Sequence, residues 1–311
     1  MFAIVFREIL TNTFSFLCGF VDSLRFKRVA EYFLASKTIR KAILSCFLLN
    51  AVLFMGLIIS YEIFMNYLVY ADNFLGDFLQ KFLLLFQLIY YPILTTTYLV
   101  SFIMSSFWFG DIAEEAISIE RRLFENKNFV SRNIDLATRV TNEIYRIFLV
   151  IFFFIQFTLL GILPFIGPIM KILHISFLYS LYCFEYKWGT DSYLMKNLAF
   201  FEVNFSYFMG FGFVFAVTTN YFPFLLSTGL YAVFFPFFLL TATRATPPMI
   251  TEGMTVGDFI YRRNWQYATI KKFEYNEEKY EENKKFKLFY FCRKGIRIIQ
   301  KIIEKLVEGK I

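Results

Sequence analysis

Long apolar runs separated by charged segments dominate the pattern of this chain of 311 residues. Residues 42–70 carry a single charge, on Glu62, and residues 82–110 carry none. Because a helix rises about 1.5 Å per residue, roughly 20 residues cross the hydrocarbon of a bilayer. Both runs are long enough, and the sequence therefore predicts two long transmembrane helices.

Two later apolar blocks, 147–186 and 207–243, are each interrupted near the middle by proline. Proline removes a backbone donor and clashes with the preceding turn, so each block is predicted to fold back on itself. Each block is either two full spans, which gives six spans in all, or a hairpin that returns to its own side of the bilayer. The residues of the predicted hairpin turns are Gly161, Pro164, Gly167, Pro168 and Pro223.

Polar segments set the remaining boundaries. Residues 1–41 form a basic, amphipathic helical arm, 111–146 a polar loop with helices, and 249–311 a basic, amphipathic tail. The sequence thus predicts an all-α integral membrane protein whose membrane domain spans residues 42–248. The positive-inside rule places both termini in the cytosol and requires an even number of crossings, for shallow and full hairpins alike.

The same topology places residues 187–206 in the cytosol. This segment contains the sequon Asn204-Phe-Ser206, which we therefore expect to stay unglycosylated.

Both basic ends are candidates for contact with anionic lipid headgroups. The tail combines an apolar stripe with a separate row of cations, which favours adsorption to a membrane surface, although a partner groove and a solvated helix remain alternatives. For the arm, an interfacial helix and a solvated helix are equally compatible with the pattern. The residues of the tail pattern are Ile299, Ile302, Ile303 and Leu306, with Arg297, Lys301 and Lys305 on another face.

Composition supports a membrane class and offers no catalytic chemistry. The chain is 58% apolar and 18% charged, whereas soluble domains approach a quarter charged residues. Its four cysteines lack the spacing of a disulfide framework or a zinc site. No phosphate-binding loop or nucleophile elbow occurs, and the N-terminus lacks the features of a secretory signal. We expect neither an enzyme, nor a cofactor, nor a nucleic-acid partner.

The segment 173–188 holds the most distinctive side chains. His174 and Glu185 are three helical turns, or about 16 Å, apart and cannot pair directly. Ionisable groups in membrane segments are functional candidates, but hydrogen bonding to neighbouring helices is the favoured interpretation here. Ser176 and Ser180, with Cys183 extending the stripe, favour close helix packing.

This segment also carries a resemblance. The runs LHISFLYSLYCFEYKW (173–188), KNLAFFEVNFSYFMGFGF (196–213) and FFPFFLLTATRATPP (234–248) resemble the etoposide-induced protein family of the endoplasmic reticulum. The likeness covers 145–248 well, extends weakly to the arm and the first spans through the order of elements only, and has no counterpart for 261–311. Its motif residues are His174, Ser176, Ser180, Tyr182, Cys183, Phe184, Glu185, Tyr186 and Trp188.

The resemblance implies a multi-pass endoplasmic reticulum protein linked to autophagy and cell death, and similar to the bacterial sulfate permease CysZ. It also implies hairpins that penetrate the bilayer partly. The first functional hypothesis is therefore a scaffold or membrane-remodelling component of autophagy, whose partners would be a second copy or autophagy-related proteins.

The second hypothesis is a CysZ-like sulfate or anion permease, and a packing subunit with no transport path is the third. A permease needs backbone amides or cations near the midplane, because a dianion in hydrocarbon is very costly. The turn from Gly161 to Pro168 is a source of amides. Lysine and arginine are not expected at central depth.

Overall fold

The computed structural model describes residues 2–124, 151–153, 155–156, 158–159, 164–188, 194–245 and 247. The described residues are helical, or belong to the turns and short links between helices, and strands are absent among them. This confirms the predicted all-α fold class. The helices are α1 (Phe2–Ser23), α2 (Phe26–Ala35), α3 (Lys37–Phe47), η1 (Leu48–Phe54), α4 (Met55–Phe124), α6 (Gly167–Trp188), α7 (Leu194–Val203), α8 (Phe205–Asn220) and α9 (Phe224–Arg244).

The chain divides into two compact units. The first unit comprises Met1–Leu24, Lys127–Ala216 and Arg244–Ile311, and the second comprises Arg25–Asn126 and Val217–Thr243. Among the described helices, α1, α6, α7 and most of α8 lie in the first unit, while α2, α3, η1, α4 and α9 lie in the second. The predicted tail and the turn residue Gly161 fall outside the described residues.

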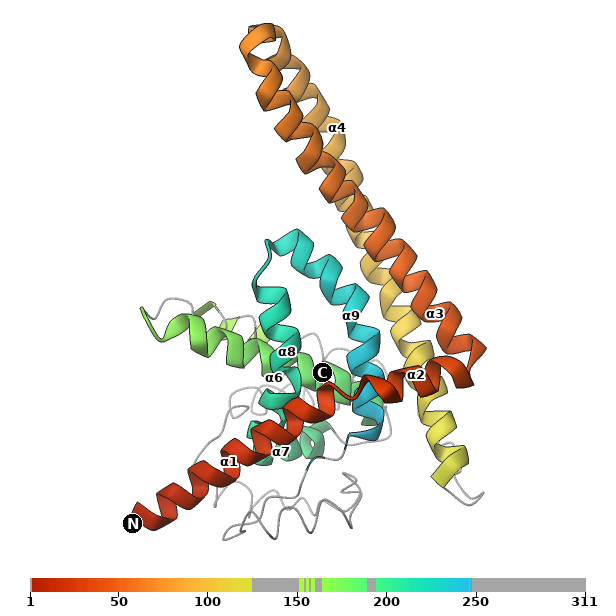
Figure 1. Ribbon diagram of the computed structural model, residues 1–311, viewed down its shortest axis with the longest axis vertical. Coiled ribbons are helices and arrows are strands. Elements are labelled where there is room, and N and C mark those ends of the chain that lie inside the picture. The colour runs from red at the N-terminus through yellow and green to blue at the C-terminus, as the bar shows by residue number, and fades with distance from the viewer. Residues whose placement is uncertain are drawn as a thin grey trace, which may run out of the picture. The chain divides into compact units, whose positions relative to one another are not determined.

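The second unit contains a long antiparallel helical hairpin, in which α3, η1 and the first half of α4 run beside the second half of α4 (Figure 1). The residues that contact one another across it confirm that its two sides are antiparallel, because a residue later on one side contacts a residue earlier on the other. The ring of Phe54 lies 5.8 Å from that of Tyr98, and the ring of Tyr61 lies 4.4 Å from that of Tyr90. Aromatic side chains therefore pack across the hairpin in a regular antiparallel register.

Four described helices are long and apolar enough to cross a membrane, and a bent pair of helices would be a fifth. The two long spans predicted from the sequence are confirmed, although the first begins before residue 42 and ends before residue 70, and the second continues beyond residue 110. Residues 111–124, expected at the start of a polar loop with helices, continue α4. The spans are Lys37–Tyr67, Phe82–Glu120, Gly167–Trp188 and Leu225–Arg244, and the bent pair is Asn197–Val203 with Phe205–Asn220.

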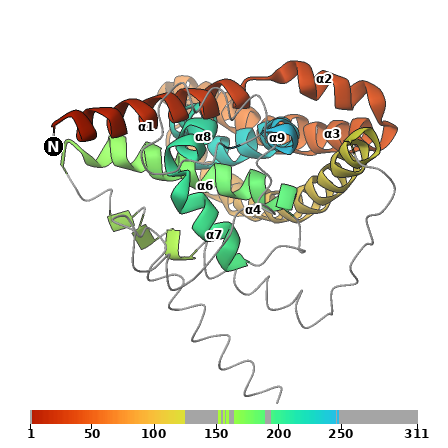
Figure 2. The same cartoon turned by 90° about the horizontal axis from the view of Figure 1, so that it is seen from below.

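In the first unit, α8 lies between α1 and α6 (Figure 2). A side chain at Gly210 would collide with the backbone of Phe16 in α1, and one at Gly212 with the backbone of Ser176 in α6. Glycine is therefore required on both sides of α8 for backbones to approach so closely. The helix α7 precedes α8 at an angle of 89°.

Two of the predicted hairpin turns lie in the described structure. Pro164 begins a tight turn in which the amide of Ile166 donates to the carbonyl oxygen of Pro164 at 2.7 Å. The central residue, Phe165, has a φ of 59°, a conformation rare for residues other than glycine. Gly167 and Pro168 then open α6, where proline at the second position costs no helical hydrogen bond.

The later turn occupies Tyr221 to Pro223, between α8 and α9. The amide of Ser227 donates to the carbonyl oxygen of Pro223 at 2.8 Å, which ties the turn to the first turn of α9.

Candidate functional site

The motif segment forms α6, and its small residues face α8. Ser176 and Ser180 are completely buried, one turn apart. The hydroxyl of Ser180 donates to the carbonyl oxygen of Phe208 at 2.5 Å, and a Cβ added at Gly212 would lie 1.8 Å from the carbonyl oxygen of Ser176. The two backbones therefore meet with little side-chain volume between them, and Cys183 is buried farther along α6.

His174 is buried near the other end of α6. Its Nε2 lies 3.3 Å from the carbonyl oxygen of Phe153, and the two rings are 4.7 Å apart between centroids. Glu185 is half-buried three turns away, so the structure separates these two ionisable groups, as the sequence predicted. The imidazole therefore contacts a neighbouring backbone segment.

Aromatic rings surround the C-terminal half of α6. Phe184 is fully buried and makes edge-to-face contacts of 4.9 Å with Phe208 and 5.0 Å with Phe211. Trp188 packs in the same way against Phe200 and Phe201 of α7. Such pairs add about 0.5–1.5 kcal/mol each beyond burial. This cluster holds α6, α7 and α8 together around the bend.

Half-buried polar residues occur near the C-terminal end of α6. Tyr182 and Tyr186 are half-buried, and the ammonium of Lys187 lies 5.5 Å from the centroid of Phe184. The same ammonium, in the last turn of α6, donates to the carbonyl oxygen of Ala245 in the same unit. A cation at a helix C-terminus is favourable because the last carbonyl groups lack helical partners.

The sequence interpretation missed the contribution of α1 to this bundle. A Cβ added at Gly19 would lie 2.0 Å from the carbonyl oxygen of Tyr207. Next to it, the hydroxyl of Tyr207 donates to the carboxyl group of Asp22 at 2.7 Å, and both side chains are buried. The available signal was the spacing of small and polar residues along 12–22 within an otherwise apolar helix.

Asn204 lies at the bend between α7 and α8. It is 1% exposed, and its side-chain amide donates to the carbonyl oxygen of Phe200 at 3.0 Å. A glycan cannot be attached to this amide in the folded chain, whichever side of the membrane it faces. We predict that this sequon stays unglycosylated, and a glycan on this amide would contradict both the packing at the bend and the predicted cytosolic position of residues 187–206.

A second polar cluster joins the long hairpin of the second unit. Asn50, in η1, donates to Ser105 at 2.8 Å and accepts a hydrogen bond from Ser101 at 2.7 Å. All three side chains are 2% exposed. A π-helical turn places an extra residue in the helix, and such turns often occur at functional positions. Here the extra residue brings an amide into contact with the returning helix.

We predict that Asn50→Leu destabilises the second unit by about 2 kcal/mol, because two interhelical hydrogen bonds in an apolar environment are lost. The midpoint of thermal unfolding in detergent measures this effect. Asn66→Leu, at an exposed position of the same hairpin, is the matched control and should change the midpoint little. Equal midpoints for the two variants would contradict the assigned role of Asn50.

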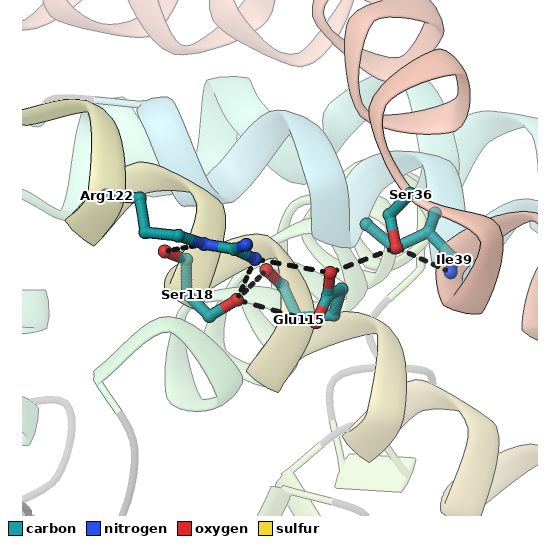
Figure 3. A network of polar contacts seen from close by, with 5 residues as sticks. All are labelled: Ser36, Ile39, Glu115, Ser118 and Arg122. Atoms are coloured by element: carbon teal, nitrogen blue, oxygen red, sulfur yellow. Dashed lines mark hydrogen bonds and ion pairs between the residues drawn. The ribbon is translucent and has the colours of Figure 1, made fainter.

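At the end of the long hairpin, acidic residues of α4 hold the turn between α2 and α3 (Figure 3). The hydroxyl of Ser36, the N-cap of α3, donates to Glu115 at 3.0 Å, and Arg122 pairs with the same carboxylate at 3.5 Å. One turn of helix farther on, Tyr32 donates to Glu120 at 2.7 Å. These contacts fix where the chain turns into the first span.

A cavity of about 440 Å³ lies beside the start of the same span. Lys37 and Lys41, one turn apart on α3, line one wall, and Trp108 and Asp111 of α4 line the other. Its chemistry therefore combines two cations, one carboxylate and an indole. This is the arrangement expected where a polar headgroup meets the end of a span.

Lys171 was overlooked by the sequence interpretation. It lies in the second turn of α6, after the turn at Pro164, and is half-buried. It is a cation inside a helix that is apolar enough to cross a membrane. In the described ranges, groups of three or more histidine, cysteine, aspartate or glutamate side chains suited to a metal ion are absent.

Comparison with known proteins decides the family. A family model described as "Sulfate transporter CysZ/Etoposide-induced protein 2.4" matches residues 25–226, the greater part of the chain. This chain belongs to the EI24 family. The match begins at α2 and reaches both long spans, which the sequence analysis related to the family only through the order of elements. It ends at residue 226, so the run 234–248 lies outside it. It also includes α6 and its aromatic cluster.

Relatives from three organisms are similar to this chain, and two of them match more than two thirds of it. Protein EI24 homolog of Arabidopsis thaliana is 29% identical over 82% of this chain and 88% of its own. Protein EI24 homolog of Dictyostelium discoideum is 26% identical over 74% and 73%. Ectopic P granules protein 4 of Caenorhabditis elegans is 29% identical over 49% and 48%. None of the solved structures matches the chain significantly.

Proposed function

We propose that this EI24 family protein resides in the endoplasmic reticulum membrane and supports autophagy as a scaffold or membrane-remodelling component. Membership of the EI24 family carries the proposal. The motif residues support a scaffold, because Ser176, Ser180 and Phe184 are buried in contacts between helices. A side chain used in this way holds the bundle together and is not available to a solute.

Deletion of the gene tests whether the protein supports autophagy. We expect a lower autophagic flux under starvation, restored by the full chain. Re-expression of Gly110→Ala, at an open position with nothing within 4 Å of an added Cβ, should restore flux equally well. Unchanged flux in the deletion strain rejects the proposal.

Topology within that membrane is part of the proposal. Both termini face the cytosol, and the connection at residues 68–81 between the long spans faces the lumen. We expect an acceptor sequon inserted in 68–81 to be glycosylated, and sequons added at either terminus to remain unmodified. Sensitivity of the product to a glycosidase measures this, and a glycan at either terminus reverses the orientation.

An anionic phospholipid headgroup is the proposed ligand of the cavity beside α3. Two lysines, Lys37 and Lys41, attract a phosphate, while Asp111 accepts a hydrogen bond from a headgroup hydroxyl or ammonium. Lys37→Gln with Lys41→Gln should reduce the retention of anionic lipid by the purified protein. Lys27→Gln, at an exposed position of α2, serves as the control, and equal retention in both variants rejects the site.

An anion permease is the second candidate, and Lys171 favours it. This cation lies close to the turn at Pro164, where the chain leaves regular helix. We expect labelled sulfate to enter proteoliposomes faster than empty vesicles if the permease hypothesis holds, and Lys171→Gln to slow entry while Lys81→Gln does not. Uptake equal to that of empty vesicles rejects this function.

A further inference from the structure

The first helix has its polar side turned inward and its apolar side turned outward. This is the reverse of a helix that packs against a soluble core. The buried residues on the inner face include Thr11, Ser15, Cys18, Asp22 and Ser23. The exposed large apolar residues are Phe6, Ile9, Leu10, Leu17, Val21 and Leu24.

Charge is excluded from the exposed surface along most of α1. Residues 9–24 hold one charged group, Asp22, and this side chain is 1% exposed. The other charges lie at the two ends, at Arg7 and Glu8 before this segment and from Arg25 onward after it. An uncharged exposed face thus extends for about 24 Å, given a rise of 1.5 Å per residue. An aqueous helix of this length normally carries charge on its exposed face.

The position of α1 against α8 fixes its surroundings. At Gly19 and Gly210 the two helix backbones are so close that an added Cβ at either would lie 2.0 Å from a carbonyl oxygen of the other helix. The helix α8 carries no charged residue and belongs to the bent pair that is apolar enough to cross a membrane. Helices with touching backbones lie at the same depth where they cross, so α1 lies at the depth of α8 at this point.

We propose that α1 is embedded in the bilayer, with its exposed apolar face against the acyl chains of one leaflet. On its polar inner face, the contacts with α8 include hydrogen bonds from Tyr207 to Asp22 and from Ser206 to Asn12. The cations that follow Leu24 lie at headgroup level, where they are favoured beside anionic lipid. The first helix of the predicted arm is therefore a component of the membrane bundle and lies deeper than a helix adsorbed on headgroups.

Nitroxide accessibility tests the inference on the full chain in proteoliposomes. The label is placed at Leu17→Cys or Val21→Cys, in a Cys292→Ser background. The native cysteines 18, 46 and 183 are at most 5% exposed, which protects them from labelling in the folded protein. We expect collisions with oxygen, which concentrates in the bilayer, to exceed those with a water-soluble nickel chelate several-fold.

Control positions separate the outcomes. A label at Lys27→Cys on α2 should show the opposite ratio, with the nickel chelate dominant. If the chelate also dominates at residues 17 and 21, α1 lies in water and the inference is wrong. If both quenchers are excluded there, a protein segment or a second copy covers the face, and the inference is equally wrong.

Discussion

Gly212→Leu is expected to prevent α6 and α8 from packing, with the loss of about 3 kcal/mol or more of stability. A Cβ at this position would lie 1.8 Å from the carbonyl oxygen of Ser176, where the obstacle is backbone. Backbone cannot rotate away as a flexible side chain does, so the helices must separate. The hydrogen bond from Ser180 to Phe208 would be lost in the same step. Thermal unfolding in detergent and the steady-state amount of protein measure the effect.

Glycines elsewhere in the chain provide matched controls. An added Cβ at Gly56 or Gly110 meets nothing within 4 Å. Alanine at either position should leave stability unchanged or raise it by up to about 1 kcal/mol, because glycine is a poor helix former. Gly212→Ala should still be destabilising. If Gly212→Ala behaves like Gly56→Ala, then close packing of α6 on α8 is not what the motif segment provides.

Tyr207→Phe is expected to lower the free energy of unfolding by about 2 kcal/mol, since it deletes the donor to a buried carboxyl group. The hydroxyl of Tyr207 lies 2.7 Å from Oδ2 of Asp22, and these side chains are 0% and 1% exposed. Loss of the donor leaves the carboxyl group less well satisfied in an apolar environment. The variant should therefore weaken the attachment of α1 to α8.

Two further variants test whether the loss of stability comes from the hydrogen bond between Tyr207 and Asp22. Tyr221→Phe removes the hydroxyl of a residue that is 86% exposed at the turn before α9, and should change stability by less than about 0.5 kcal/mol. Asp22→Asn combined with Tyr207→Phe should cost less than the sum of the single variants, because the two groups interact directly. Additive effects, or equal effects of Tyr207→Phe and Tyr221→Phe, would remove the case for this contact.

The sequence predicted correctly those structural features that depend mainly on the residues within a single segment. Hydrophobicity predicted the two long spans, because the transfer of apolar side chains into lipid depends on local composition. Proline predicted the turn at Pro223 correctly, yet α4 and α9 continue through Pro92 and Pro236. Proline in a membrane helix is tolerated where neighbouring groups satisfy the freed carbonyl, so the residue alone does not decide a break.

The bend at Asn204 had no such signal, since neither glycine nor proline occurs there. An asparagine side chain that bonds the backbone four residues earlier competes with helical hydrogen bonding, but it does so in many straight helices. Packing of Trp188 on Phe200 and Phe201 holds α7 away from the axis of α8. Trp188 is more than ten positions from Phe200 and Phe201 in the sequence. A pattern within a single segment therefore does not predict that these residues pack together.

The candidate site shows the same difference between features set by local sequence and features set by contacts between distant segments. By itself the sequence determined the membrane class, the long spans and the family motif at 173–188, because each follows from residues close together along the chain. Only the tertiary structure decided that Gly19, Gly210 and Gly212 bring three helices into backbone contact, and that Asp22 of α1 meets Tyr207 of α8. The contacts of α1 with α8 join segments almost two hundred residues apart, and the energy of all these contacts exists only when the helices meet.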